Sequence, residues 1–327
     1  MKELIINYLT QKTKIYLKNN LLSQVSTLID QNKKYVIITD EIVYNLYKEK
    51  INFPNSHFII LKSGEQEKNI QTVLKIIQDM LELNISKSDY IINFGGGVVS
   101  DIGGFVASIY KRGIPYYNIP TTLLSQVDAT IGGKTGIDFG NFKNQIGTIY
   151  HPSKVFIDPT LLTTLDQDNY LSGLGEVIKY AICFDEEFYN SLKEPLDLEE
   201  VVYKCIKIKA EITKQDEFDT NVRMVLNFGH TIGHALESYF NYQIPHGICV
   251  AYGMYYEIED FHIRESLMKI LNYFHFPPLP QFSKTELEKY LYQDKKIRDG
   301  YLKIPVLEKI GKVIIKNEKI TDLVKRL

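Results

Sequence analysis

The sequence predicts two domains, an α/β domain at the N-terminus and an all-α domain at the C-terminus. In the first half, short apolar segments rich in β-branched residues alternate with longer helical patterns, as expected for βαβ units and a doubly wound parallel sheet. The second half is predicted to be mainly helical, with prolines between its helices. A length of 327 residues suits two domains of about 150 residues each. We place the boundary between residues 1–158 and residues 159–327.

The expected elements follow from these patterns in chain order. Four short apolar segments are predicted strands: residues 35–39, 57–61, 90–94 and 116–120. A longer pattern predicts a helix over residues 68–83, between the second and third strands. In the second half, helices are predicted over residues 175–182, 199–214, 224–239 and 283–292. Strand signals are rare there until residues 313–315.

Composition and charge exclude several classes of protein. Hydrophobic residues make up 44% and charged residues 24% of the chain, which rules out a disordered or collagen-like protein. The net charge of −2 gives no electrostatic reason to expect nucleic acid or an anionic membrane as a partner. The polar N-terminus and the lack of a long apolar run predict neither a secretion signal nor a membrane span.

The three cysteines, Cys183, Cys205 and Cys249, are odd in number and lack C-x-x-C spacing. This pattern argues against a disulfide framework or a zinc ribbon and fits a reducing compartment. We therefore expect a cytoplasmic protein.

A glycine-rich turn follows the third predicted strand and opens a helical pattern. Gly95-x-Gly97-x-x-Ser100 is close to the dinucleotide fingerprint, with serine in the third glycine position. Glycines there let backbone N–H groups approach a pyrophosphate at the positive end of a helix. An ordinary tight turn explains an isolated glycine triplet equally well. The following pair, Gly103-Gly104, would let the helix pack closely on the sheet.

Two further segments follow predicted strands, where loops of an α/β sheet face the ligand. Residues 63–68 and residues 121–122 offer hydroxyl, amide and ammonium donors for ribose or phosphate. Each is also an ordinary helix-capping sequence, and for each segment alone that explanation is favoured.

The strongest feature is a polar stripe in the predicted helix 224–239 and just before it. Arg223, Asn227, His230 and His234 are spaced by 4, 3 and 4 residues, which places them on one face of a helix. A solvated face would carry Lys, Glu and Gln, and a core face would be apolar, so the stripe indicates a site in an internal cleft. The two histidines can bind one metal or divide the roles of ligand and acid–base. Because the H-E-x-x-H motif is absent, a metalloprotease is disfavoured.

Two other residues could complete a metal site. His246 lies in a predicted loop, where a lone histidine is usually structural, and Glu176 lies in a predicted helix, where its usual role is to interact with the helix dipole. Two histidines from separate elements with a carboxylate nevertheless make a typical open zinc site. Lys179 and Lys209 also fall on predicted helices, where a solvated lysine is the default.

A connector rich in lysine and glycine lies near the end of the first half. Residues 132–135 resemble the end of a P-loop, but Val127 stands where the first glycine is required, so we reject an NTPase. The connector is predicted to be flexible and to present three side chains to an anionic substrate: Lys134, Lys143 and Asn144. Arg112 is another candidate anion contact.

Taken in order, these residues closely resemble the 3-dehydroquinate synthase family. The resemblance covers roughly residues 35–315. Each motif is weak alone, but the ordered set is specific. The matching segments are residues 63–65, 95–101, 120–124, 132–135, 175–180, 226–237, 246–247 and 294–296.

The resemblance implies a Rossmann-like, NAD-binding α/β domain and a helical metal- and substrate-binding domain, usually in a homodimer. It implies a phosphate-eliminating lyase that converts 3-deoxy-D-arabino-heptulosonate 7-phosphate (DAHP) to 3-dehydroquinate in the shikimate pathway. The implied cofactors are NAD, which is oxidised and regenerated in each turnover, and a divalent metal, zinc or cobalt. The implied partner is an anionic sugar phosphate.

Residue by residue, the resemblance assigns roles to the candidates. Its metal ligands match Glu176, His230 and His246. Arg223 and Lys209 match residues that hold the substrate carboxylate. The residues around the substrate phosphate match Lys134, Asn144, Asn227 and His234.

Four more residues match catalytic or substrate contacts of the family. Arg112 matches an arginine that reaches a neighbouring subunit, Lys179 lies near the metal-bound hydroxyls, and either Lys295 or Lys296 closes over the substrate. The residues that match NAD contacts are Asp40, Ser63, Gly64, Glu65, Lys68, Gly97, Val98, Val99, Ser100, Asp101, Thr121, Thr122, Lys134, Lys143, Leu161, Leu162, Thr163 and Thr164.

The chain departs from the family pattern at three places. Residues 140–144 keep only the last two residues of the usual Pro-Leu-Gly-Lys-Asn, Ser100 replaces a frequent glycine, and Lys111 replaces an apolar residue. These changes concern the shape of loops and leave the charged groups in place.

Three alternatives remain open. Other sugar-phosphate cyclases use substrates without a carboxylate. Such a substrate would give no reason for Arg223 beside Lys209. Metal-dependent polyol dehydrogenases typically use Asp followed by His one helical turn later, whereas this chain has Glu176 and Lys179. A degenerate, non-enzymatic homologue is disfavoured because every expected charged group is present.

Overall fold

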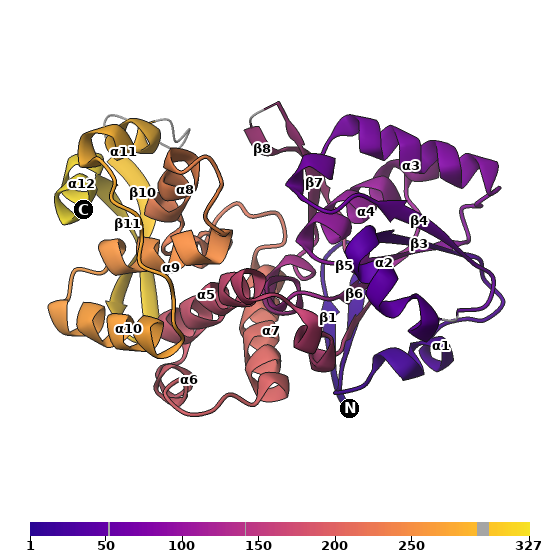
Figure 1. Ribbon diagram of the computed structural model, residues 1–327, viewed down its shortest axis with the longest axis horizontal. Coiled ribbons are helices and arrows are strands. Elements are labelled where there is room, and N and C mark those ends of the chain that lie inside the picture. Colours follow the sequence, from indigo (N-terminus) through magenta and orange to yellow (C-terminus); the bar gives the residue numbers. More distant parts are fainter. Residues whose placement is uncertain (52, 141, 293–300) are drawn as a thin grey trace. The chain divides into compact units, whose positions relative to one another are not determined.

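The computed structural model describes residues 1–51, 53–140, 142–292 and 301–327, which form two compact units (Figure 1). The first unit comprises Met1–Leu165 and Leu198–Phe218, and the second comprises Asp166–Asp197 and Asp219–Leu327. The chain therefore enters the second unit, returns to the first to contribute α7 (Leu198–Gln215), and leaves again. The single boundary predicted after residue 158 does not describe this return.

A seven-stranded sheet forms the centre of the first unit, in the order β1-β2-β9-β6-β5-β3-β4. Its strands are β1 (Lys2–Asn7), β2 (Lys12–Leu17), β3 (Tyr35–Asp40), β4 (Ser56–Leu61), β5 (Tyr90–Gly95), β6 (Tyr116–Pro120) and β9 (Lys154–Ile157). Neighbouring strands run parallel except for β1 and β2, which form an antiparallel pair at one edge. The four predicted strands are confirmed as β3, β4, β5 and β6. The other three were missed because β1 and β2 mix charged with apolar residues and β9 has only four residues.

Helices cover both faces of this sheet, which confirms the doubly wound arrangement (Figure 1). One face packs on α3 (Ile70–Glu82) and α4 (Gly97–Ile109), and the other packs on α1 (Val25–Leu28) and α2 (Glu41–Tyr47). Alternate residues of β3 point to opposite faces, as strand geometry requires. Val36 lies in the first core and Tyr35 in the second. Short 3₁₀ helices connect these elements at Leu22–Gln24, Lys48–Lys50, Glu65–Glu67, Tyr110–Arg112 and Pro159–Thr164.

The connector that we predicted to be flexible is instead an ordered hairpin. A π-helical turn (Ser125–Ala129) leads into the antiparallel strands β7 (Lys134–Phe139) and β8 (Phe142–Ile149). Gly136 and Gly147 are paired across it, and a Cβ atom on Gly147 would lie 2.2 Å from the carbonyl oxygen of Thr135. These glycines therefore allow two strands to approach closely, and their number does not indicate flexibility here.

The second unit is mainly helical. Its helices are α5 (Gln167–Phe184), α6 (Glu186–Ser191), α8 (His230–Tyr239), α9 (His246–Glu257), α10 (Phe261–Tyr273), α11 (Lys284–Leu291) and α12 (Ile320–Arg326). The α/β-plus-helical fold class is thus confirmed with one correction to its all-helical part, the antiparallel hairpin of β10 (Tyr301–Lys309) and β11 (Lys312–Lys319). Of the helices in the described residues, none has the length and apolarity needed to cross a membrane.

The helix predicted over residues 224–239 is interrupted. A 3₁₀ helix (Val222–Asn227) ends before Gly229, which has a left-handed φ of 78°, and α8 begins at His230. Gly229 also packs tightly on α9, because a Cβ atom there would lie 2.5 Å from Cγ of Met254. Arg223 and Asn227 therefore do not share one continuous helix with the two histidines, and this part of the predicted stripe was wrong.

The glycine pair in α4 fits the packing role suggested by the sequence. A Cβ atom on Gly103 would lie 1.8 Å from Oδ1 of Asn93, a buried residue of β5 that donates a hydrogen bond from Nδ2 to Asn118. A side chain on Gly103 would therefore push α4 away from the sheet.

We expect Gly103→Ala to destabilise the protein by about 2 kcal/mol, because the added methyl group overpacks the interface of α4 with β5. Urea unfolding followed by circular dichroism measures this change. Gly97→Ala is the matched control, since its new Cβ atom would meet nothing closer than 3.9 Å. Equal stabilities for the two variants would contradict the packing argument.

Candidate functional site

Three helices of the second unit bring the predicted metal ligands together. Glu176 lies on α5, His230 begins α8, and His246 begins α9. The Nε2 atoms of both histidines lie 3.6 Å from Oε1 of Glu176, and one donor atom from each residue falls within 4.8 Å of the others. Tetrahedral zinc ligands at their usual bond lengths are about 3.3 Å apart, so a small inward movement would suffice to enclose a cation. His246 was predicted in a loop, but it is the first residue of a helix.

Glycines next to two of these ligands explain how α5 and α9 approach so closely. A Cβ atom on Gly175 would lie 2.0 Å from the carbonyl oxygen of Gly247, and one on Gly247 would lie 1.7 Å from that of Ser172. The backbone N–H of Gly247 also donates to Oγ of Ser172 at 3.0 Å. Any larger residue at either glycine would separate Glu176 from His246.

The environment of Glu176 favours a charged carboxylate. Its side chain is 1% exposed, so burial opposes ionisation, but Lys179 and the two histidines outweigh burial and hold its pKa well below the usual range. Lys179 forms an ion pair with Glu176. Neither carboxylate oxygen accepts a well-oriented hydrogen bond from the described part of the chain. A buried carboxylate without such donors is suited to a cation.

The two histidine ligands differ in their protonation. Burial and the nearby Lys179 ammonium lower the pKa of His230 well below its usual value, which leaves its imidazole neutral. Burial also acts on His246, but contacts with Glu176 and Glu237 raise its pKa to about 10. A cation at Nε2 of His246 would therefore displace a proton.

Backbone and carboxylate acceptors orient both imidazole rings. Nδ1 of His246 lies 3.2 Å from Oε1 of Glu237, and Nδ1 of His230 donates to the carbonyl oxygen of Phe228 at 3.2 Å. Each ring thus directs Nε2 toward Glu176, in the arrangement that commonly supports metal-bound histidines. Two imidazoles and a carboxylate fit a divalent cation such as zinc or cobalt. Glu237 was missed as a candidate because the sequence indicates nothing beyond its place near the end of a helix.

His234 lies beside this group without joining it. Its side chain is 61% exposed, and its Nε2 is 3.8 Å from Oε2 of Glu237. A second possible metal group consists of His234, Glu237 and His246. That group would need Nδ1 of His246, which already faces Glu237 as its hydrogen-bond partner, so the group around Glu176 is the better cation site.

In the first unit, the predicted dinucleotide contacts gather where the strands end. Asp40 ends β3, Ser63 follows β4, and the hydroxyl of Ser63 donates to Oδ1 of Asp40 at 3.2 Å. The turn at Gly97 follows β5 and begins α4, whose N-cap residue provides no side-chain hydrogen bond. Thr121 and Thr122 follow β6. Parallel strands place these loops at one edge of the sheet, where α/β proteins bind nucleotides.

A buried lysine, Lys68, connects two other predicted residues. Nζ of Lys68 lies 2.9 Å from Oδ2 of Asp101 and donates to Oδ1 of Asn144 at 2.7 Å. Burial raises the pKa of Asp101, and Lys68 partly offsets this effect. Nζ of Lys143 lies 4.0 Å from Oε1 of Glu65, another predicted NAD contact.

Several of the remaining NAD candidates are buried or contact other side chains of the same unit. Leu161 and Leu162 are buried, and the hydroxyl of Thr164 is 2.6 Å from that of Tyr47. Val99 and Ser100 are also buried, whereas Gly64, Val98 and Thr163 are not.

The cationic candidates are distributed over both units. In the first unit, Lys209 contacts the carbonyl oxygen of Asp128 at 2.6 Å and its carboxylate at 2.9 Å, a partner that the sequence analysis missed. Lys134 and Arg112 are exposed. In the second unit Arg223 is buried. Lys295 and Lys296 lie outside the described residues.

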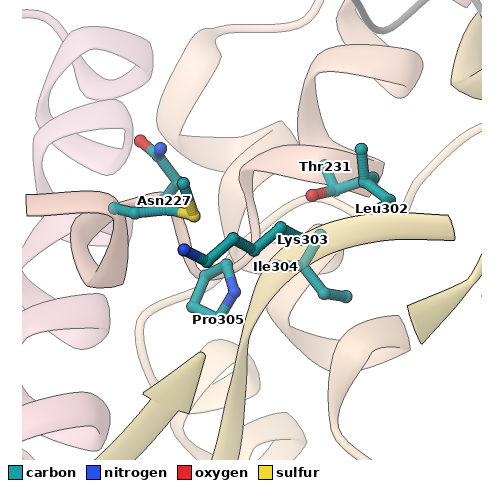
Figure 2. A pocket seen from close by; sticks show the side chains of 7 residues that line it. Asn227, Thr231, Leu302, Lys303, Ile304 and Pro305 are labelled. Atoms are coloured by element: carbon teal, nitrogen blue, oxygen red, sulfur yellow. The ribbon is translucent and has the colours of Figure 1, made fainter. Parts of the chain in front are cut away.

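Asn227 lines a small pocket of the second unit (Figure 2). The 3₁₀ helix, α8 and β10 supply its walls: Met224, Asn227, Thr231, Leu302, Lys303, Ile304 and Pro305. Figure 2 shows the Lys303 side chain extending along the pocket toward Asn227. Lys303 was not among the predicted residues, because an exposed lysine on a strand carries no distinguishing pattern.

Several solved structures of enzymes share this fold. A 2-deoxy-scyllo-inosose synthase in complex with carbaglucose-6-phosphate, NAD⁺ and Co²⁺ matches with a TM-score of 0.89 and 22% identity, covering 99% of this chain and 98% of that one. An iron-containing alcohol dehydrogenase from Corynebacterium glutamicum matches with a TM-score of 0.67 and 14% identity, covering 100% and 96%. These similarities define the fold class, which this chain shares with 2-deoxy-scyllo-inosose synthase and with iron-containing alcohol dehydrogenase.

Sequence similarity identifies the family within this class. Models of the N-terminal and C-terminal parts of 3-dehydroquinate synthase match residues 58–172 and 173–297. The 3-dehydroquinate synthase of Clostridium botulinum is 37% identical, covering 98% of this chain and 99% of that protein. That of Dictyoglomus turgidum is also 37% identical, covering 100% and 98%. The chain belongs to the 3-dehydroquinate synthase family.

We expect Gly247→Ala to destabilise the second unit by about 3 kcal/mol, because its Cβ atom would clash with the backbone of α5. It should also weaken Co²⁺ binding by separating Glu176 from His246. Urea unfolding and calorimetric titration with Co²⁺ measure the two effects. Gly97→Ala again serves as the control, and unchanged Co²⁺ affinity in Gly247→Ala would refute the role of the close approach.

Proposed function

We propose that this protein is a 3-dehydroquinate synthase, which converts DAHP to 3-dehydroquinate and phosphate in the shikimate pathway. The observation that carries the proposal is the 37% identity to proteins of that name over nearly the whole of both chains. The cluster of Glu176, His230 and His246 supports it, since the reaction requires a metal site. The cyclases that use other substrates share only 22–24% identity with this chain.

The proposed cofactors are NAD and a divalent metal, zinc or cobalt. We assign NAD binding to residues 1–158, and metal and substrate binding to residues 159–327. The crystallised relatives support the choice of cofactors, because one holds NAD⁺ with Co²⁺ and another holds NAD⁺ with Zn²⁺. In the first unit, α4 begins without a side-chain cap, and N–H groups at such a helix start suit the pyrophosphate of a dinucleotide.

The bound metal would supply Lewis-acid polarisation of substrate hydroxyls, and NAD would accept a hydride and return it. The protein's own residues bind and orient the substrate. Lys179, paired with Glu176, is suited to stabilise a hydroxyl as it loses its proton. His234 is exposed, has an imidazole and can exchange a proton with phosphate. The substrate undergoes no net oxidation, because the hydride is returned and the products are 3-dehydroquinate and inorganic phosphate.

The proposed substrate contacts are those that the family resemblance implies, residue by residue. Arg223 and Lys209 bind the carboxylate. The phosphate is bound by Lys134, Asn144, Asn227 and His234. We further propose a cytoplasmic homodimer in which Arg112 serves the neighbouring subunit, and that Lys295 or Lys296 closes over the substrate.

Incubation with DAHP and a catalytic amount of NAD should release phosphate in step with 3-dehydroquinate, without net accumulation of NADH. EDTA should abolish the activity, and Zn²⁺ or Co²⁺ should restore it, because the metal polarises the substrate. Colorimetric phosphate detection and NADH absorbance follow the two outcomes. Accumulating NADH would instead indicate a polyol dehydrogenase, and activity that is indifferent to chelation would refute the metal site.

Arg223→Ala should raise the KM for DAHP by about 10- to 100-fold, because a charge-assisted contact with the carboxylate is lost. Steady-state phosphate release measures KM and kcat. The control is Lys325→Ala, which removes a cation whose side chain is 76% exposed. An unchanged KM in Arg223→Ala would favour a cyclase whose substrate has no carboxylate.

A further inference from the structure

A buried carboxylate at the end of α9 reaches back to the beginning of α8. Glu257 is 2% exposed, and its two oxygens accept backbone hydrogen bonds from different residues. Oε2 accepts from the N–H of Gly229 at 2.7 Å, and Oε1 accepts from the N–H of Ile232 at 3.1 Å. The positions of these donors relative to His230 connect Glu257 to the candidate metal site.

Glu257 replaces the usual N-terminal cap of α8. The residue that precedes this helix is Gly229, which has no side chain to offer. Most helices receive such a cap from the residue next to them, whereas this one comes from a residue 28 positions away. Burial is unfavourable for the carboxylate and raises the pKa of Glu257 to about 8, although the backbone donors oppose the shift. The favourable helix dipole and the two N–H donors offset part of the cost of that burial.

The hydrogen bond to Gly229 also determines the orientation of a peptide group. The N–H of Gly229 and the carbonyl of Phe228 belong to the same planar peptide unit, so fixing one fixes the other. That carbonyl accepts the hydrogen bond from Nδ1 of His230 at 3.2 Å. Nε2 of the same ring lies 3.6 Å from Glu176. A continuous chain of contacts therefore runs from Glu257 through one peptide group to His230.

Packing against α9 also restricts the peptide group between Phe228 and Gly229. Gly229 adopts a φ of 78°, and its Cα lies against α9, where Val250 and Met254 leave no space for a side chain. α9 carries Glu257 at its last position and His246 at its first. The same helix thus supplies one candidate ligand and the group that orients another.

We propose that Glu257 is a positioning residue for the metal site, holding the peptide between Phe228 and Gly229 so that its carbonyl orients His230. The inference deepens the proposed function, since it rests on the metal site assigned there. Outer hydrogen-bond partners of metal-binding histidines typically change metal affinity by about 10- to 100-fold. Glu257 acts one step further out, through the backbone.

The test uses the full-length protein and Co²⁺ alone, without substrate or NAD. Glu257→Gln keeps the size of the side chain and one acceptor oxygen, whereas Glu257→Ala removes both acceptors. We expect Co²⁺ affinity to fall about 10-fold in Glu257→Gln and further in Glu257→Ala, with altered visible absorption of bound Co²⁺. Calorimetric titration and the Co²⁺ spectrum measure these effects, and kcat for DAHP should fall more than KM rises.

Glu259→Gln is the matched control. Glu259 lies two residues away, is 61% exposed and contacts Arg326, so its variant should bind Co²⁺ like the wild type. Unfolding of the metal-free variants separates stability from positioning. If Glu257→Gln is less stable but binds Co²⁺ with unchanged affinity and spectrum, Glu257 is only a helix cap and the proposal is overturned. If Glu257→Ala does not fold, the result for Glu257→Gln decides.

Failure of the proposed function gives a different result. If the wild-type protein binds Co²⁺ but releases no phosphate from DAHP, the proposed function is wrong. The Co²⁺ affinities of the Glu257 variants still decide whether Glu257 positions His230. A wild-type protein that does not bind Co²⁺ would overturn both, since His230 would then have no metal to face.

Discussion

The candidate site depends on the contact between the backbones of α5 and α9. Gly175 and Gly247 each lie beside a predicted ligand, and each would clash with the opposite helix if it carried a Cβ atom. Helices normally stay 8–10 Å apart because side chains separate them. Where glycines remove that spacing, short side chains from both helices can converge on one point. Glu176 can therefore lie buried within 3.6 Å of His246.

Burial of a charged carboxylate imposes conditions on its surroundings. Glu176 is opposed by desolvation, so it needs Lys179 and histidine contacts to stay ionised. His246 in turn is held between Glu176 and Glu237. This network requires α9 to keep a fixed register against both α5 and α8, because a shift of one residue in α9 would remove both contacts. The polar contacts of the site therefore depend on the close packing of the helices, which Gly175 of α5 and Gly247 of α9 permit.

Prediction from the sequence succeeded where local patterns decide the structure. The strands at residues 35–39 and 90–94 are buried on both faces, so their apolar runs are unambiguous. Prediction failed where the same residue type can serve two structural purposes, as glycine does in flexible segments and in close packing. The glycines of residues 132–147 suggested flexibility but allow a tight hairpin, and Gly229 ends the helical pattern that the neighbouring residues suggested. The two histidines stood out as candidates because histidine is unusual on helical faces, whereas Glu176 was a candidate only in combination with them, and their role as ligands stays a prediction.

Residues that orient the ligands are harder to find, for a physical reason. Glu237 and Glu257 contact the site through hydrogen bonds whose partners lie far along the chain, and neither has a local signature. A glutamate at the end of a helix is common, and only its burial distinguishes it. Burial depends on tertiary packing that no local pattern encodes. Because a buried carboxylate is unfavourable unless its donors are in place, its presence indicates a strong constraint. In this chain that constraint lies on the peptide between Phe228 and Gly229, whose N–H contacts Glu257 and whose carbonyl accepts the hydrogen bond from His230.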